Sequence, residues 1–140
     1  AEQRGIETRL IVDPVSEDYR NITTLRGTLA DGTVLAVSGT LSGTRMVEKI
    51  VGFNDYEIEV PIAQHHIVML YTDRPGIVAI YGQKFGDAGI NIAGLQVARS
   101  QRGAQLSVLT VDSRVPEELL DEVREAIQAD LLVQLEITEA

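Results

Sequence analysis

The change of hydrophobic period along the second half of the chain constrains the fold most strongly. Apolar residues alternate with a period of two over residues 67–72 and again over 131–137, which is typical of half-buried strands. Between these segments the spacing switches to three and four, which is typical of a helix with one apolar face. The elements expected in order are a strand at 67–72, a helix over 75–88, strands at 90–99 and 104–111 joined by a turn at 101–103, a helix opening at 116, and a strand at 131–137.

Proline and glycine mark the helix ends. Pro75 suits the first position of a helix, where its missing N–H has no consequence, and Gly89 is a natural stop. Pro116 opens the second helix, with acidic residues in its first turn that favour the helix dipole. The predicted apolar stripes are Ile77, Ile80, Tyr81, Phe85 and Ala88 in the first helix, and Leu119, Leu120, Val123, Ala126 and Ile127 in the second.

The resulting β-α-β-β-α-β order is the split βαβ, or ferredoxin-like, pattern, in which both helices cover one face of an antiparallel sheet. The chain divides near residue 64 into a β-rich first half and this second half, so the predicted fold class is α+β. An Asp31-Gly32 pair and the Asn54-Asp55 pair signal hairpin turns, and Ser38–Arg45 reads as a tight turn. The strands expected in the first half are 6–12, 22–29, 33–41, 46–51 and 56–60.

Composition excludes several classes of function. The net charge of −9 argues against nucleic acid or an anionic membrane as partner, because neutralising phosphates needs clustered Lys and Arg. Without cysteine there is no disulfide, thiolate nucleophile or Cys-ligated metal site. No run is long enough to span a bilayer, and a cytoplasmic location is expected. The first residue is Ala1, so we expect a processed chain or a piece of a longer polypeptide.

The junction Asp73-Arg74-Pro75-Gly76 is the main candidate site. The N–H groups of Gly76, Ile77 and Val78 would have no partner in the first helical turn, and the helix dipole there favours an anion such as a carboxylate. Gly76 has no Cβ, so a ligand could approach the backbone closely. The alternative is an ordinary turn and helix start, with Asp73 or Arg74 acting as a cap.

A polar Asn91 begins the next strand, where its β-propensity is poor. Its carboxamide both donates and accepts, so it can read the ammonium and carboxylate groups of an amino acid. The alternative is a turn residue that satisfies local backbone groups.

Other motifs give weaker signals. His65 and His66 are adjacent in a strand, so they point to opposite faces and cannot chelate one ion together, and a linker or surface role is expected. The stretch SGTLSGTR lacks the phosphate-cradling P-loop arrangement, and Arg45 or Lys49 is a candidate for a second anion site. We therefore expect no catalytic centre, metal or cofactor in this chain.

Residues 66–136 resemble an ACT domain, the small-molecule regulatory module of amino-acid metabolism. The resemblance rests on Tyr71-Thr72-Asp73, on Arg74-Pro75-Gly76 and on the segment 87–92, Asp-Ala-Gly-Ile-Asn-Ile. The first half is similar to the intervening, allosteric substrate-binding domain of long-form D-3-phosphoglycerate dehydrogenases, through the segments 30–33, 37–41 and 49–51. These resemblances imply an intervening domain over 1–64 and an ACT domain over 65–140.

The resemblance implies a regulatory region that lacks the NAD-binding and catalytic domains and forms a homodimer or higher homo-oligomer through the ACT domain. Its effector would be L-serine or a related amino acid, bound where two ACT domains meet, with family contacts falling on Tyr71, Asp73 and, from the facing subunit, Asn91. The complete set of expected effector-binding residues is Tyr71, Asp73, Arg74, Pro75, Gly76, Ile77 and Asn91.

Some members of the family carry a second, anionic effector site in the intervening domain. Lys49 fits its lysine position, but Glu57 and Pro61 stand where a His and an Arg are expected. Two alternatives to the sensory function stay open. One is a module that only dimerises, and the other is the regulatory module of a bacterial L-serine dehydratase, whose partner would be an iron–sulfur catalytic chain.

Overall fold

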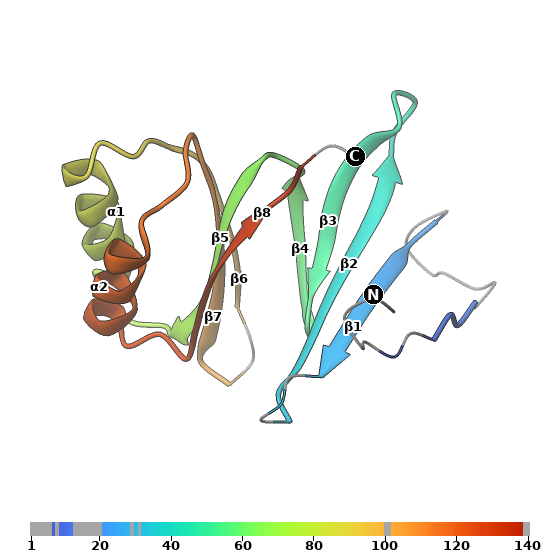
Figure 1. Ribbon diagram of the computed structural model, residues 1–140, viewed down its shortest axis with the longest axis horizontal. Helices are drawn as coiled ribbons and strands as arrows, with labels where there is room; N and C mark the ends of the chain where they lie inside the picture. The colour runs from blue at the N-terminus through green and yellow to red at the C-terminus, as the bar shows by residue number, and fades with distance from the viewer. Residues whose placement is uncertain are drawn as a thin grey trace.

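The computed structural model describes residues 7, 9–12, 21–28, 30, 32–99 and 102–138. Its described part forms two four-stranded sheets and two helices (Figure 1). The elements in order are β1 (Thr23–Thr28), β2 (Val34–Ser42), β3 (Val47–Phe53), β4 (Tyr56–Pro61), β5 (His65–Thr72), α1 (Ile77–Asp87), β6 (Ile92–Arg99), β7 (Ala104–Val111), α2 (Glu117–Ile127) and β8 (Leu131–Glu136).

The second sheet has the strand order β6-β7-β5-β8, and each neighbouring pair is antiparallel. Both helices lie on one face of it, on the left in Figure 1. The predicted α+β class and the ferredoxin-like β-α-β-β-α-β arrangement are therefore confirmed. The chain changes from the first sheet to the second between Pro61 and His65.

Helix α1 begins two residues later than predicted. Gly76 has φ +91°, in the left-handed region, so neither it nor the preceding Pro75 is part of the helix. The first helical hydrogen bond is donated by the Ile80 N–H to the Gly76 carbonyl oxygen at 3.0 Å. The prediction placed Pro75 at the first helical position because its missing N–H has no consequence there, but the left-handed Gly76 separates the proline from the helix.

The apolar stripe of α1 is narrower than predicted. Ile77, Tyr81 and Phe85 are buried, whereas Ile80 and Ala88 are exposed. Ile80 lies beside the buried face, and Ala88 is the C-cap residue after the last helical residue, Asp87. In α2, Leu120, Val123 and Ile127 are buried, Leu119 and Ala126 are half-buried, and the acidic first turn is present.

The first sheet is a meander, β1-β2-β3-β4, of antiparallel neighbours. The predicted turn at Asn54 is confirmed: its N–H donates to the Ala36 carbonyl at 2.7 Å, and its Oδ1 accepts from the Ala36 N–H at 2.9 Å. The predicted tight turn over Ser38–Arg45 is wrong in its first half. Residues 38–42 continue β2, with a β-bulge between Ser38 and Gly39, because they stay paired with β3.

The strand predicted over 6–12 is not found in its described residues. Glu7 and residues 9–12 lie outside any strand, and Leu10, Ile11 and Val12 are 75–89% exposed. Their alternating pattern has no partner strand in the described part of the chain, and a strand needs one to satisfy its backbone. Ile6, Thr8, Asp31 in the first predicted hairpin turn and Gln101 in a later one lie outside the described residues.

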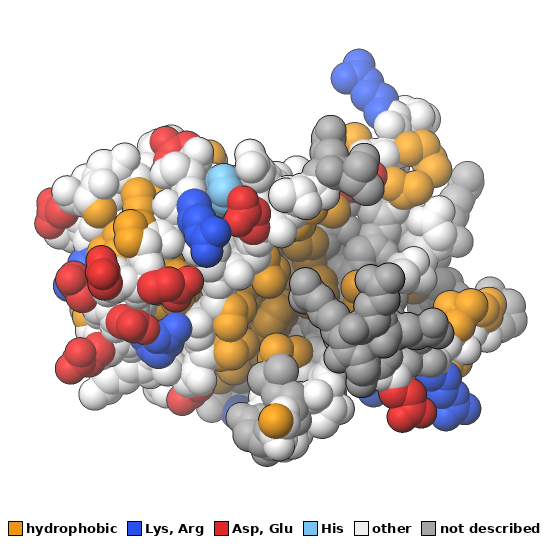
Figure 2. All heavy atoms as spheres, viewed as in Figure 1, with side chains coloured by type: hydrophobic (Ala, Val, Ile, Leu, Met, Phe, Trp, Pro, Cys, Tyr) orange, Lys and Arg blue, Asp and Glu red, His pale blue; other side chains and the backbone are white. Residues whose placement is uncertain are grey.

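The two sheets share a core. Besides the helix-side core, a second cluster joins the helix-free face of the second sheet to the first sheet, and it includes Ile50, Phe53, Ile58 and Val60 on one side and Val68, Leu106 and Val108 on the other. The described part is thus three layers: helices, second sheet and first sheet (Figure 1). Hydrophobic side chains show in the hollowed region between the two sheets, and acidic side chains gather over the helical layer (Figure 2).

His66 lies at the change from one sheet to the other and is fully buried. Its Nε2 accepts a hydrogen bond from the Ala63 N–H at 3.0 Å, in the short connector after β4. His66 lies inside β5 and is buried, so the expected linker or surface role is wrong for this residue. The sequence gives no signal of this burial, because it depends on the first sheet covering that face of β5.

Candidate functional site

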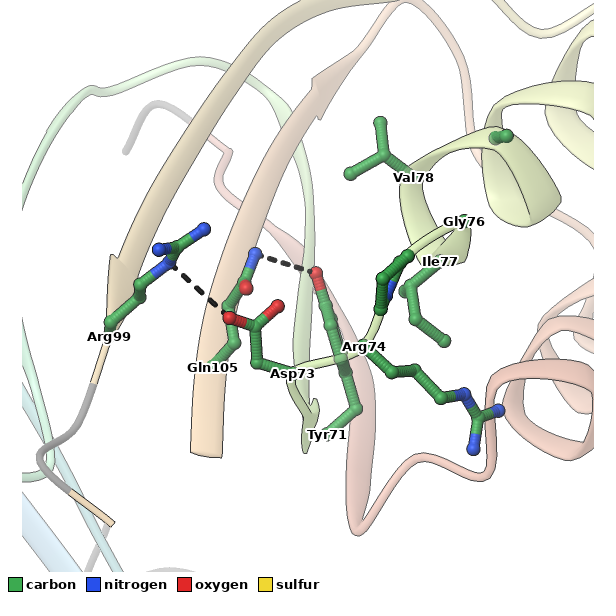
Figure 3. Close-up of a pocket in the computed structure, with 10 residues that line it drawn as sticks. Tyr71, Asp73, Arg74, Gly76, Ile77, Val78, Arg99 and Gln105 are labelled. Atoms are coloured by element: carbon green, nitrogen blue, oxygen red, sulfur yellow. Dashed lines mark hydrogen bonds and ion pairs between the residues drawn. The ribbon is translucent and has the colours of Figure 1, made fainter. Parts of the chain in front are cut away.

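A hollow of about 510 Å³ opens where β5 ends and α1 begins (Figure 3). Its volume lies within the range of sites for small molecules. Six of the predicted residues lie around it, and four others join them from α1 and from strands β6 and β7. The lining residues are Tyr71, Asp73, Arg74, Pro75, Gly76, Ile77, Val78, Ala79, Arg99 and Gln105.

The start of α1 forms one wall and presents hydrogen-bond donors. The N–H groups of Ile77, Val78 and Ala79 have no acceptor within the helix, because they lie in its first turn. A Cβ built on Gly76 would meet nothing within 4 Å, so the glycine is required by its φ of +91° and the space beside it is open. This wall therefore suits an anionic group such as a carboxylate.

Asp73 and Arg99 form an ion pair at the rim of the hollow, with Arg99 Nε 3.5 Å from Asp73 Oδ2. Both side chains are partly exposed, so the pair contributes little stability and can exchange partners readily. Arg74 lines the hollow, but its guanidinium points away and donates to Gln128 Oε1 at 2.9 Å (Figure 3). Arg74 therefore does not present its charge to the site.

A buried polar network lies beneath the rim. The Tyr71 hydroxyl is 2.7 Å from the Ser107 hydroxyl and accepts from Gln105 Nε2 at 3.1 Å. Gln105 is only 5% exposed, and its Oε1 has no hydrogen-bond partner in the described part of the chain. Nearby, burial raises the pKa of Tyr81 to about 12, and the neighbouring Tyr71 adds to this shift.

Arg99 and Gln105 were not among the predicted site residues. Both follow from the strand register, because Tyr71 pairs with Gln105 and Gln105 pairs with Arg99. In the predicted βαββαβ order the first two strands run parallel, so their C-terminal ends lie at the same end of the sheet. This could have pointed to Arg99, which ends the second of these strands. The exact pairing that sets Gln105 beside Tyr71 cannot be read from the hydrophobic pattern alone.

Asn91 does not line this hollow. Strands β5 and β6 are both antiparallel to β7, so they run parallel to each other, and the start of β6 lies at the opposite end of the sheet from Asp73. The Asn91 N–H donates to Asp112 Oδ1 at 3.1 Å, and its carbonyl accepts from the Asp112 N–H at 3.2 Å. Within one chain, Asn91 and Asp73 are therefore not brought together.

The predicted second anion site is not assembled in the described residues. Lys49 lines a separate hollow on the first sheet, but Arg45 is not among its lining residues. Glu48 also lines that hollow, and Lys49 Nζ lies 4.0 Å from Glu59 Oε1. Two carboxylates beside one lysine do not favour an anion, so nothing in the structure adds support to this prediction.

The main hollow is complementary to a zwitterion. Asp73 and Gln105 Oε1 offer acceptors for an ammonium or hydroxyl group, and the α1 N-terminus offers donors for a carboxylate. Among the described residues no group of three metal-ligating side chains occurs, and none of their helices could cross a membrane.

Comparison with known proteins shows which proteins the chain is similar to. The family model for the ACT domain matches residues 65–128. Proteins named D-3-phosphoglycerate dehydrogenase are similar over most of the chain: that of Mycobacterium bovis is 32% identical over 129 residues, 92% of this chain and 24% of its own length. That of Mycobacterium leprae is 29% identical over 94% of this chain and 25% of its own length, and that of Synechocystis sp. is 31% identical over 88% and 22%.

The chain spans about a quarter of the length of these relatives. The predicted resemblances to an ACT domain and to a region of D-3-phosphoglycerate dehydrogenases are both confirmed. The hollow lies within residues 65–128, the part of the chain that matches the ACT domain family model.

Proposed function

We propose that this chain is a regulatory region of a D-3-phosphoglycerate dehydrogenase and binds L-serine, or a related small amino acid, in the hollow at the start of α1. The observation that carries the proposal is the pairing of helix N–H donors with the acceptors Asp73 and Gln105 around one hollow. The ligand carboxylate would lie at the α1 N-terminus, and its ammonium would take the place of Arg99 beside Asp73.

The site would be completed by a second copy of the chain. Strand β6 is an edge of the second sheet, and an edge strand readily pairs with another strand. An antiparallel β6–β6 pairing about a twofold axis would place Asn91 of the partner subunit next to Arg99, at the rim of the hollow. This accounts for the distance between Asn91 and Asp73 within one chain.

The edge carries apolar side chains suited to such an interface. Leu95 and Val97 pair with Leu109 and Ser107, which places them on the helix side of the sheet, and they are 36% and 42% exposed. Val78 on α1 is also exposed and lines the same hollow as Arg99. A partner subunit would cover these residues together with the mouth of the site.

Serine that bridges two subunits would change the free energy of their interface, and so the activity of the catalytic part of the longer protein. That part would be an NAD-dependent dehydrogenase of serine biosynthesis in the cytoplasm, and serine would act as a feedback inhibitor. Couplings of this kind are typically about 1–3 kcal/mol, so small changes at the interface suffice.

Titration calorimetry of the 140-residue chain with L-serine, glycine and L-alanine tests the proposal. We expect serine to bind, and Asp73→Asn to weaken that binding at least tenfold because the neutral amide cannot pair with the ammonium ion. Asp55→Asn, a change of the same kind in the β3–β4 turn, is the matched control and should bind serine as the parent does.

A parent chain that forms a dimer but binds none of the three amino acids would contradict the sensory function. That outcome would favour the alternative of a module that only dimerises. The sequence that precedes this region in a longer protein would distinguish a dehydrogenase from a dehydratase. A nucleotide-binding α/β pattern there would identify the dehydrogenase.

A further inference from the structure

Gln105 is the deepest polar group of the hollow that keeps unused hydrogen-bonding capacity. Its side-chain oxygen is buried without a partner in the described part of the chain, while its nitrogen is held by the Tyr71 hydroxyl at 3.1 Å. A buried acceptor without a partner is rare in folded proteins and needs an explanation. Because Gln105 also lines the hollow, a bound ligand is the most direct explanation (Figure 3).

The depth of each polar group indicates which part of the ligand it meets. Asp73 and Arg99 lie at the rim, with side chains 37% and 74% exposed, and the free N–H groups lie at the start of α1. The two charged groups of an amino acid are best held by these, because a charge is much more costly to bury than a neutral group. The uncharged side chain of the ligand is then left for the floor, where Gln105 presents a neutral acceptor.

We propose that Gln105 sets the specificity of the site by accepting a hydrogen bond from a hydroxyl group on the ligand side chain. The inference rests on the proposed function, and it assigns the ammonium group to Asp73 and the hydroxyl group to Gln105. Tyr71 and Ser107 hold the amide in place from below, since the Tyr71 hydroxyl joins both. Serine gains a hydrogen bond to the Gln105 oxygen that an amino acid without a side-chain donor cannot form, and that gain is the source of discrimination.

The test compares L-serine with L-alanine by titration calorimetry on the parent chain and on Gln105→Met, which keeps the length of the side chain and removes the acceptor. The parent should bind serine at least about tenfold more tightly than alanine. Gln105→Met should bring serine to the affinity of alanine and leave alanine within about twofold of the parent value. Gln64→Met, exposed in the connector between β4 and β5, is the matched control and should keep the preference for serine.

A second comparison does not depend on any variant. O-methyl-L-serine keeps the side-chain oxygen but cannot donate to Gln105, so the parent chain should bind it no better than alanine. Retention of the serine preference in Gln105→Met would overturn the inference, and so would an equal loss of serine and alanine binding. A parent chain that binds neither amino acid would instead overturn the proposed function, so the two failures are distinguishable.

Discussion

His66 shows at the scale of one residue how the two sheets are joined. Its Nε2 accepts from the Ala63 N–H, so the ring is neutral and carries its proton on Nδ1, which lies 3.3 Å from Thr110 Oγ1. Burial lowers the pKa of His66, the neighbouring His65 lowers it further, and a hydrogen bond with the Leu109 backbone opposes the shift. A protonated ring could not accept a hydrogen bond from the Ala63 N–H, so this contact between the β4–β5 connector and β5 requires the neutral form of His66.

The stability of the chain should therefore fall as the solution becomes acidic. The unfolded chain takes up a proton on His66 near pH 6.5, whereas the folded chain resists it because its pKa is lowered. The His66 contribution to the free energy of unfolding is complete above about pH 6.5 and is lost progressively below it. Urea unfolding measured between pH 7.5 and pH 5.5 checks this.

His66→Gln is the control for that measurement. Its amide can accept from Ala63 and donate to Thr110, but it does not titrate. The variant should lose stability less steeply than the parent over this pH range. An identical slope in the two proteins would show that His66 is not the group responsible.

The residues of the hollow differ in how far the sequence could predict them. Asp73 to Ile77 were predicted because a strand end, a turn and a helix start are adjacent in the chain, so their chemistry is local. Arg99 and Gln105 come from strands β6 and β7, and their places depend on register. The left-handed conformation of Gly76 was also missed, because Pro75 alone gave a simpler helix start.

At the scale of elements, the order of strands and helices was predictable and their ends were less so. Every helix and strand of the second half was predicted, since each carries a hydrophobic period, and Pro75, Gly89, Gly103 and Pro116 mark several of their boundaries. The wrong predictions fall where strand pairing, which the local sequence does not show, decides the structure. Residues 38–42 continue β2 despite their glycine and serines, because they pair with β3. Residues 10–12 were predicted as part of a strand, but they have no partner strand in the described part of the chain.

Strand β6 is the element on which the proposed interface depends. Val97→Lys should prevent two β6 strands from pairing, because it places a charge among the apolar side chains of this edge, beside Leu95. Val97 is 42% exposed in the single chain, so the charge can reach water and the fold should be kept. We expect a monomer by light scattering after gel filtration, with serine binding lost.

Val47→Lys is the matched control, since Val47 is similarly exposed but lies in β3 of the first sheet. It should leave both the dimer and serine binding unchanged. A Val97→Lys protein that remains dimeric would show that β6 is not the interface.

At the scale of the whole molecule, the first sheet covers the face of the second sheet that the helices leave free. Val68, Leu106 and Val108 are buried there against residues such as Phe53 and Val60 of the first sheet. The helices cover one face of the second sheet and the first sheet covers the other. Another subunit can therefore pair with the second sheet at its lateral strands, β6 and β8. The sequence predicted both halves, but it could not show how they pack, because that contact joins residues that no local pattern relates.

The central claim is that each site takes Asp73 from one subunit and Asn91 from the other, and mixing two variants tests it most directly. Asp73→Asn and Asn91→Ala should each weaken serine binding at least tenfold, and Asn91→Ala should fold normally because the two hydrogen bonds between Asn91 and Asp112 use the Asn91 backbone. When the two variants are refolded together, every mixed dimer regains one intact site, which is about one site per four chains. Calorimetry that detects this recovered serine binding would support the account, and a mixture that binds no serine while forming mixed dimers would contradict it.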